Sequence, residues 1–358
     1  MTTPLRIGFL PLVDAALLVA AREQGFAEEQ GLAIELVRDV SWANLRDRLS
    51  VGLLDAAHML APAAIAATLG LGHLRVPMAA PIALNMNGNA ITVSRALFAE
   101  MVMAADGDLG DVNVAARAFA GAAAQRAAHG AEAPVLASVF PFSSHMLLLS
   151  EFLRRAGLKA GSDVPIVVLP PQLMAASLAN GQIDGFCAGA PWNAYAVEAG
   201  LGAIAALGLD LIAGSVEKLL VLRAADLDNN LETALAVVRA VLAAAKWAGS
   251  EGNRRRLALH LSTAAYLDAP AAMIESVLAG RIDPGAGRTE WSVPDYLRID
   301  PDALAPSEAA ADRLLDEMIA AGQMSEEADS RQRARRVFRG RSFSGCVSSP
   351  VTKSRFSA

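Results

Sequence analysis

Two stretches of the sequence place a hydrogen-bonding side chain where a helix is predicted to begin. In SWANLRDRL (residues 41–49), Ser41 is the expected N-cap and Trp42 opens the helix. In SSHMLLL (residues 143–149), Ser143 or Ser144 is the expected N-cap, and His145 lies in the first turn. The free N–H groups and partial positive charge of a helix start suit a small anion. Taken singly, Trp42 is more often a packing residue and His145 more often a surface residue at such positions.

Two further residues have side chains that could recognise a small polar ligand. In LNMNGNAITVS (residues 84–94), two asparagines bracket a glycine before a β-branched run, which predicts a turn presenting amide groups beside a strand. Asn89 is the candidate there, and ordinary turn chemistry is the alternative. Lys218, in GSVEKLLVL (residues 214–222), precedes an apolar strand. A lysine at such a place is commonly solvated, but it would supply an anion site with a full positive charge.

The sequence contains none of the common catalytic motifs. It has no G-x-x-x-x-G-K-[ST] phosphate loop, no G-x-S-x-G elbow, no C-x-x-C and no H-E-x-x-H. The five histidines fall in separate predicted elements without the spacing of metal ligands. We therefore predict a protein that is not an enzyme and has neither a cofactor nor a metal.

Short apolar segments alternate with alanine-rich helical segments along the chain, which predicts βαβ units and parallel sheets covered by helices. GLLDAAHMLAP (residues 52–62) and GQIDGFCAGAPWN (residues 181–193) repeat one pattern of Gly, Asp, apolar run and Pro. In each, the glycine would end a helix and the proline would end a buried strand at a crevice. This echo predicts two related lobes facing one cleft. We assign residues 1–91 and 194–325 to the first lobe, with C-terminal helices, and 92–193 to the second.

Charge is distributed unevenly along the 358 residues. The formal charge is −6, but residues 331–358 contain eight basic residues and no acid, so the rest carries about −14. An acidic body disfavours nucleic acid and anionic membranes as partners. Residues 326–358 form a basic, serine-rich tail that we predict to be disordered. No apolar run is long enough for membrane insertion, the N-terminal segment does not match an export signal, and Cys187 and Cys346 suggest no disulfide, which together favour the cytoplasm.

Six stretches together resemble the nitrate- and bicarbonate-binding family of substrate-binding proteins, the NrtA and CmpA type: SWANLRDRL, LDAAHMLAP, LNMNGNAITVS, PFSSHMLLLSEFLRRAGL, GFCAGAPWNAYAV and VEKLLVL. The resemblance extends from about residue 5 to residue 323. It implies the α/β type II periplasmic-binding-protein fold, in which two Rossmann-like lobes enclose a ligand cleft. It also implies that Trp42, Asn89, His145 and Lys218 hold the anion. Asn89 stands where relatives have Gln, and Ala190 where many have Glu.

The resemblance also bears on the ligand and the role. Relatives that bind bicarbonate have an acid at the position of Lys218, so the lysine favours nitrate or nitrite, which need no hydrogen-bond acceptor. The branch without an export leader is that of NasS-like cytoplasmic nitrate/nitrite sensors, which control an ANTAR-type antiterminator of nitrate assimilation genes. That partner, and not this protein, would contact RNA. The alternatives are the substrate-binding component of an ABC transporter and an enzyme on the same fold.

Overall fold

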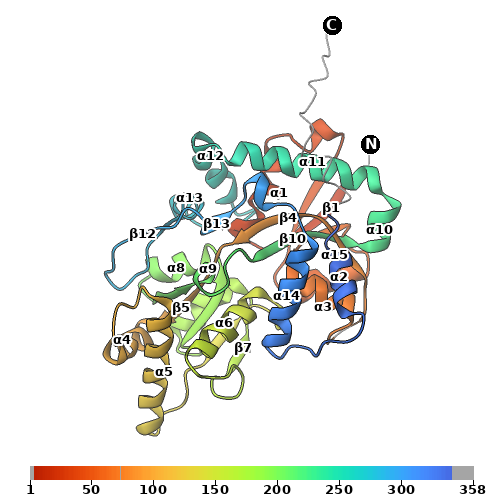
Figure 1. The fold of residues 1–358 in the computed structure, drawn as a ribbon. Helices are drawn as coiled ribbons and strands as arrows, with labels where there is room; N and C mark the ends of the chain where they lie inside the picture. The colour runs from red at the N-terminus through yellow and green to blue at the C-terminus, as the bar shows by residue number, and fades with distance from the viewer. Residues whose placement is uncertain (1–3, 73, 341–358) are drawn as a thin grey trace.

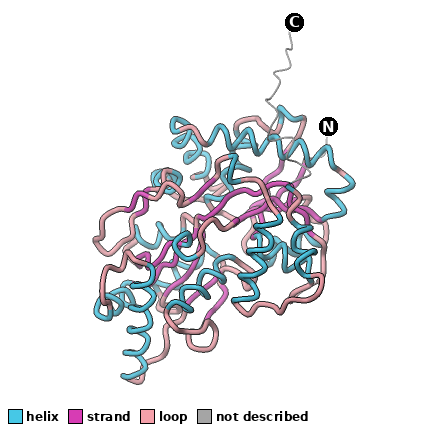
Figure 2. Tube along the Cα trace, viewed as in Figure 1, coloured by secondary structure: helices cyan, strands magenta, loops and turns pink. Residues whose placement is uncertain are grey.

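The computed structural model describes residues 4–72 and 74–340, and these form two lobes that each contain one β-sheet (Figure 1). The strands run through the middle of each lobe and the helices lie outside them (Figure 2). None of the helices in the described part of the chain combines the length and apolar character that crossing a membrane requires.

The sheet of the first lobe has six strands in the order β13-β4-β10-β3-β1-β2. Its strands β1 and β2, and β1 and β3, pair in parallel, whereas β10 is antiparallel to both β3 and β4. The strands are β1 (Leu5–Phe9), β2 (Ile34–Arg38), β3 (Ala56–Leu60), β4 (Met78–Asn87), β10 (Val216–Arg223) and β13 (Leu297–Arg298).

The sheet of the second lobe has five strands in the order β7-β6-β8-β5-β9. They are β5 (Asn89–Ser94), β6 (Leu136–Ser138), β7 (Ile166–Val168), β8 (Gly185–Gly189) and β9 (Gly202–Leu207). A separate two-stranded pair, β11 (Arg281–Ile282) and β12 (Trp291–Ser292), follows later in the chain.

Helices pack on both faces of each sheet because each presents one apolar stripe to the strands. The helices of the first lobe are α1 (Ala16–Glu23), α2 (Trp42–Ser50), α3 (Ala61–Leu69), α10 (Ala224–Asn229), α11 (Leu231–Ala248), α12 (Glu251–Leu261), α13 (Ala271–Leu278), α14 (Glu308–Ala320) and α15 (Ser330–Val337). Those of the second lobe are α4 (Arg95–Ala104), α5 (Val112–Ala128), α6 (Ser144–Arg155), α7 (Met174–Ala179), α8 (Trp192–Glu198) and α9 (Gly208–Leu211), and short 3₁₀ turns cover Val13–Ala15, Glu28–Gln30, Pro171–Leu173 and Pro301–Ala303.

The chain crosses between the lobes at Gly88, between β4 and β5, and again after α9. Gly88 has a φ of 96°, a backbone conformation that other residues rarely adopt, so this crossing favours a glycine. The second crossing corrects our predicted boundary, because β9, which we assigned to the first lobe, pairs with β5 in the second sheet. All six residues of β9 are buried, and a wholly apolar strand carries no pattern that distinguishes one sheet from the other.

The repeated Gly-Asp-Pro pattern has the same structural role in both lobes. Gly52 and Gly181 follow helices α2 and α7 with φ values of 80° and 67°. Asp55 accepts a hydrogen bond from Arg6 N, at 2.8 Å, and Asp184 accepts one from Val135 N, at 2.9 Å. Each aspartate thus ties the start of its buried strand to the neighbouring parallel strand, β3 to β1 and β8 to β6.

The prediction of a disordered tail from residue 326 is wrong for α15. Ala334, Val337 and Phe338 are buried against the first lobe, at the spacing of one helical face. On the other face, Arg331 lies 2.7 Å from Asp316 of α14, and further arginines pair with acids of the same region. Two of the basic residues that suggested a solvated tail, Arg331 and Arg335, therefore pair with acids of α14. The remaining tail residues, 341–358 with Cys346, lie outside the described residues; Cys187 is a buried free thiol in β8.

Candidate anion-binding site

The four predicted site residues lie on the facing sides of the two lobes, and all are buried. Trp42 on α2 and Lys218 on β10 belong to the first lobe, whereas Asn89 on β5 and His145 on α6 belong to the second. Their exposed fractions are 3%, 0%, 3% and 1%, respectively. The alternatives of a solvated lysine and a surface histidine are therefore excluded.

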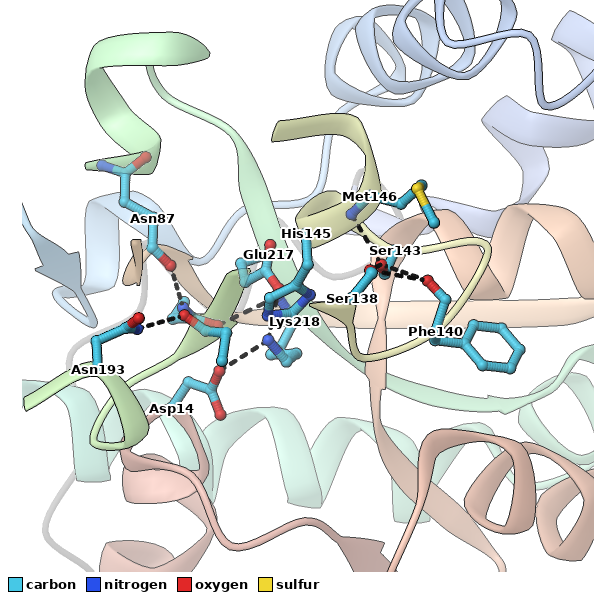
Figure 3. A network of polar contacts seen from close by, with 12 residues as sticks. Asp14, Asn87, Ser138, Phe140, Ser143, His145, Met146, Asn193, Glu217 and Lys218 are labelled. Carbon is cyan, nitrogen blue, oxygen red and sulfur yellow. Dashed lines mark hydrogen bonds and ion pairs between the residues drawn. The ribbon is translucent and has the colours of Figure 1, made fainter. Parts of the chain in front are cut away.

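Lys218 is the centre of a buried charge cluster (Figure 3). Its Nζ lies 2.8 Å from Asp14 Oδ2 and donates to Glu217 Oε1 at 2.6 Å. It also lies 5.3 Å from the centre of the Trp42 ring, a cation–π distance. The predicted cation is thus present, but it is already held by two carboxylates that the sequence analysis did not single out.

Glu217 and Lys218 reach each other because β10 is irregular at this point. Successive side chains of a regular strand point to opposite faces, which would separate these two residues. The pairing of β10 with β4 shifts register between Val216 and Lys218 and again between Lys218 and Leu219. Such an irregularity turns side chains from their regular directions, and here both charged groups lie in the same site.

Asp14 connects the cluster to a histidine on the neighbouring strand. Its Oδ1 lies 2.8 Å from Nε2 of His58, on β3, and the His58 ring stacks obliquely on Trp42 with the ring centres 5.5 Å apart. Asp14 is in the turn between β1 and α1, and Val13 N of this turn donates to Ala190 O across the lobe boundary at 2.9 Å. The sequence analysis did not single out Asp14 or His58. The only signal for each was one polar residue inside an apolar run.

The electrostatics of the cluster favour one ammonium and two carboxylates. Burial opposes each charge, but the attraction of Lys218 lowers the pKa of both Asp14 and Glu217 below their ordinary values. Burial likewise opposes the charge of Lys218, yet Asp14 and Glu217 raise its pKa. The three groups therefore carry one net negative charge.

His145 lies at the start of α6, where Ser143 is the N-cap and accepts a hydrogen bond from Met146 N at 3.1 Å. Its Nε2 is 3.8 Å from Glu217 Oε1, which is too long for a hydrogen bond. Burial lowers the pKa of the imidazole from 6.5 to about 4, more than Glu217 raises it. The side chain is therefore neutral at pH 7 and stands beside the N–H groups of a helix start.

Asn89 completes the site from the second lobe. A Cβ atom at Gly189, the partner of Asn89 in β8, would lie 3.4 Å from Asn89 Oδ1 and 3.5 Å from Asp14 Oδ2. Asn89 also lines a small pocket of about 10 Å³ together with Ser144 and Glu217. The amide therefore lies between the charge cluster and the start of α6.

Several polar atoms of this cluster find no hydrogen-bond partner among the described residues: Trp42 Nε1, Asn89 Oδ1, His58 Nδ1, and both ring nitrogens of His145. A buried polar group left unpaired costs about 1–3 kcal/mol. Their concentration between the lobes indicates a place where a small polar ligand satisfies them, with the indole N–H of Trp42 as an obligate donor.

Access to this site depends on the relative position of the lobes. A pocket of about 10 Å³ is no larger than one water molecule needs. Hydrogen bonds also join the two lobes outside this pocket, from Gln172 Nε2 to Val40 O and from Gln323 Nε2 to Pro141 O, both 2.8 Å. We therefore expect a ligand to enter when the lobes separate. A larger cavity of about 540 Å³ lies beneath α11, and none of the four predicted residues lines it.

Comparisons with known proteins assign the chain to a family and identify named relatives. Residues 1–262 match the NMT1-like family. The chain is 32% identical over 294 residues to the nitrate/nitrite binding protein NrtA of Nostoc sp., an alignment that covers 81% of this chain and 64% of the relative. It is 34% identical over 283 residues to the nitrate import ATP-binding protein NrtC of Synechocystis sp., covering 78% of this chain and 40% of the relative.

The chain also has the same fold as two solved binding proteins. The periplasmic nitrate-binding protein NrtA from Synechocystis PCC 6803 superposes with a TM-score of 0.86 at 26% identity, covering 96% of this chain and 88% of that one. The alkanesulfonate-binding protein SsuA from Xanthomonas axonopodis superposes with a TM-score of 0.64 at 17% identity, covering 91% and 95%, which concerns the fold alone.

The fold and the buried interlobe site define a two-lobed binding protein of the periplasmic-binding-protein class. The chain belongs to the NMT1-like family, and its relatives include nitrate/nitrite-binding proteins named NrtA. The NrtA relatives are named as nitrate-binding proteins, which agrees with our prediction that the chain is not an enzyme. The chain spans between 40% and 64% of the length of the two relatives aligned by sequence.

Proposed function

We propose that this chain binds nitrate or nitrite between its lobes and that the bound state is what a partner protein recognises. The observation that carries the proposal is the set of unpaired buried polar atoms around Lys218, to which both lobes contribute. A small planar oxyanion can accept hydrogen bonds from Trp42 Nε1 and His145 at the same time, and lies near the Lys218 ammonium. Relatives named as nitrate-binding proteins support this ligand.

The role that we propose is that of a cytoplasmic sensor controlling an ANTAR-type antiterminator. A ligand that binds the closed arrangement better than the open one shifts the protein towards closure by its difference in affinity. Closure brings Gln172 to Val40 and Gln323 to Pro141, so the surfaces of the two lobes become continuous at these two contacts. A partner that contacts both lobes would therefore distinguish the two states, and reciprocal coupling would make nitrate alter its affinity.

The second candidate is the ligand-binding component of an ABC import system. The names of the relatives favour it, since they include a nitrate import ATP-binding protein. The same binding reaction serves both roles, and only the partner differs. Size-exclusion chromatography with a purified ANTAR-domain antiterminator, with and without nitrate, separates them: a complex that nitrate dissolves supports the sensor, and no complex in either condition contradicts it.

Thermal unfolding tests the ligand itself. We expect sodium nitrate to raise the melting temperature relative to sodium chloride at equal ionic strength, because binding to the folded state alone stabilises it by mass action. Sodium bicarbonate is the matched competitor. A response to bicarbonate and none to nitrate or nitrite would contradict the proposed ligand.

A further inference from the structure

We propose that the anion enters this site together with a proton, which His145 takes up, and that Asp14 and Glu217 impose this coupling. The inference rests on the proposed function, since it concerns the same ligand. The affinity of the site for the anion would then depend on pH. Because of the two carboxylates, the site would accept an anion only when His145 is protonated.

The charges around Lys218 already include more negative than positive groups. One ammonium lies within 2.8 Å of the two carboxylates of Asp14 and Glu217, so its charge is more than compensated before any anion arrives. The other titratable groups near the cluster do not offset this. Burial raises the pKa of both the Cys187 thiol and the Tyr296 phenol, which keeps these groups uncharged.

A second negative charge in this water-excluded site is therefore unfavourable unless a positive charge accompanies it. The start of α6 contributes only about half an elementary charge. The two histidines that face the cluster are the groups able to accept a proton. His58 faces Asp14 and the Trp42 ring, whereas His145 faces Glu217, with Lys218 and Asp14 beyond it.

His145 is the better placed of the two. Neither of its ring nitrogens has a partner within hydrogen-bond distance among the described residues, whereas Nε2 of His58 already lies 2.8 Å from Asp14 Oδ1. An imidazolium at His145 could donate one hydrogen bond to the anion and direct the other towards Glu217. Burial holds the pKa of this group at about 4 without an anion. An adjacent negative charge favours the protonated form, so the proton binds when the anion does.

Nitrate is the right probe because it is the conjugate base of a strong acid and brings no proton of its own near neutral pH. Titration calorimetry with sodium nitrate on the full chain, in two buffers of different ionisation enthalpy, counts the protons taken up. We expect close to one proton per nitrate at pH 6, and a Kd that rises about tenfold per pH unit between pH 5 and pH 7. Equal heats in the two buffers and a Kd independent of pH would overturn the inference.

Variants locate the proton. Asp14→Asn keeps the shape of the side chain but removes the excess negative charge, so proton uptake should fall towards zero and the Kd should lose its dependence on pH. Glu217→Gln makes the same test from the other carboxylate if Asp14→Asn does not fold. His145→Gln should also abolish the dependence on pH, and His129→Gln, at an exposed histidine ending α5, should leave it intact.

The outcomes separate this inference from the proposed function. Nitrate binding without proton uptake contradicts the coupling and leaves the nitrate site standing. Proton uptake that survives in His145→Gln contradicts the assignment to His145. The absence of binding by nitrate and nitrite at every pH overturns both.

Discussion

The ligand-free protein should lose stability as the pH falls from 7 to 5, and His145 should account for much of the loss. Burial lowers the pKa of His145 from 6.5 to about 4 in the folded state. Between these two values the unfolded chain binds a proton that the folded chain does not, so acidification favours unfolding. The difference between these two pKa values corresponds to about 3 kcal/mol of stability. Between pH 7 and pH 5, about 2 kcal/mol of the free energy of unfolding should disappear.

Urea unfolding of the wild type and of His145→Gln at both pH values measures this loss. Glutamine does not titrate, so the difference in stability between wild type and variant should shrink or reverse by about 2 kcal/mol on going from pH 7 to pH 5. Asp14 should not contribute to this change. Lys218 lowers its pKa in the folded protein, and the ordinary pKa of a carboxyl group also lies below pH 5. Identical pH dependence in wild type and His145→Gln, with His129→Gln as the control, would refute the buried neutral histidine.

Three further outcomes follow from the site and the fold. Lys218→Met should destabilise the protein by about 3–5 kcal/mol in urea unfolding, because it leaves two buried carboxylates unpaired; a loss below 1 kcal/mol would contradict the charge cluster. Trp42→Phe should weaken nitrate binding about tenfold in calorimetry, because it removes the unpaired indole N–H, and unchanged affinity would remove Trp42 from the site. Deleting residues 327–358 should cost several kcal/mol, because Ala334, Val337 and Phe338 are buried; an unchanged melting temperature would mean that α15 contributes nothing.

Much of the fold could be predicted from local patterns. Alternating apolar strands and helices predict the parallel part of both sheets, and the repeated Gly-Asp-Pro pattern predicts the equivalence of β3 and β8, because helix ends and buried strands leave local signals. The sheet to which β9 belongs could not be predicted in this way, since pairing between distant strands depends on tertiary contacts. The same holds for α15. In the sequence, Arg331 and Arg335 look like part of a solvated tail, and only the tertiary structure places acids of α14 beside them.

Some residues of the site could also be predicted from local signals, whereas others could not. Trp42 and His145 could be proposed because each follows an N-cap serine, which is a local signal. Glu217 could not, because the irregular register of β10 is what turns it towards Lys218. Asp14 and His58 are single polar residues in apolar surroundings, and only the packing of β3 against the turn after β1 brings them within 2.8 Å. The consequence is substantial, since these unpredicted groups change the charge of the site.

A crystal structure of the protein grown with sodium nitrate would show whether the anion binds between the lobes. We predict one planar anion there, within hydrogen-bond distance of Trp42 Nε1 and His145 and close to the charge cluster of Lys218, Asp14 and Glu217. Anion density confined to the 540 Å³ cavity beneath α11, or an interlobe site that holds only water at saturating nitrate, would contradict it.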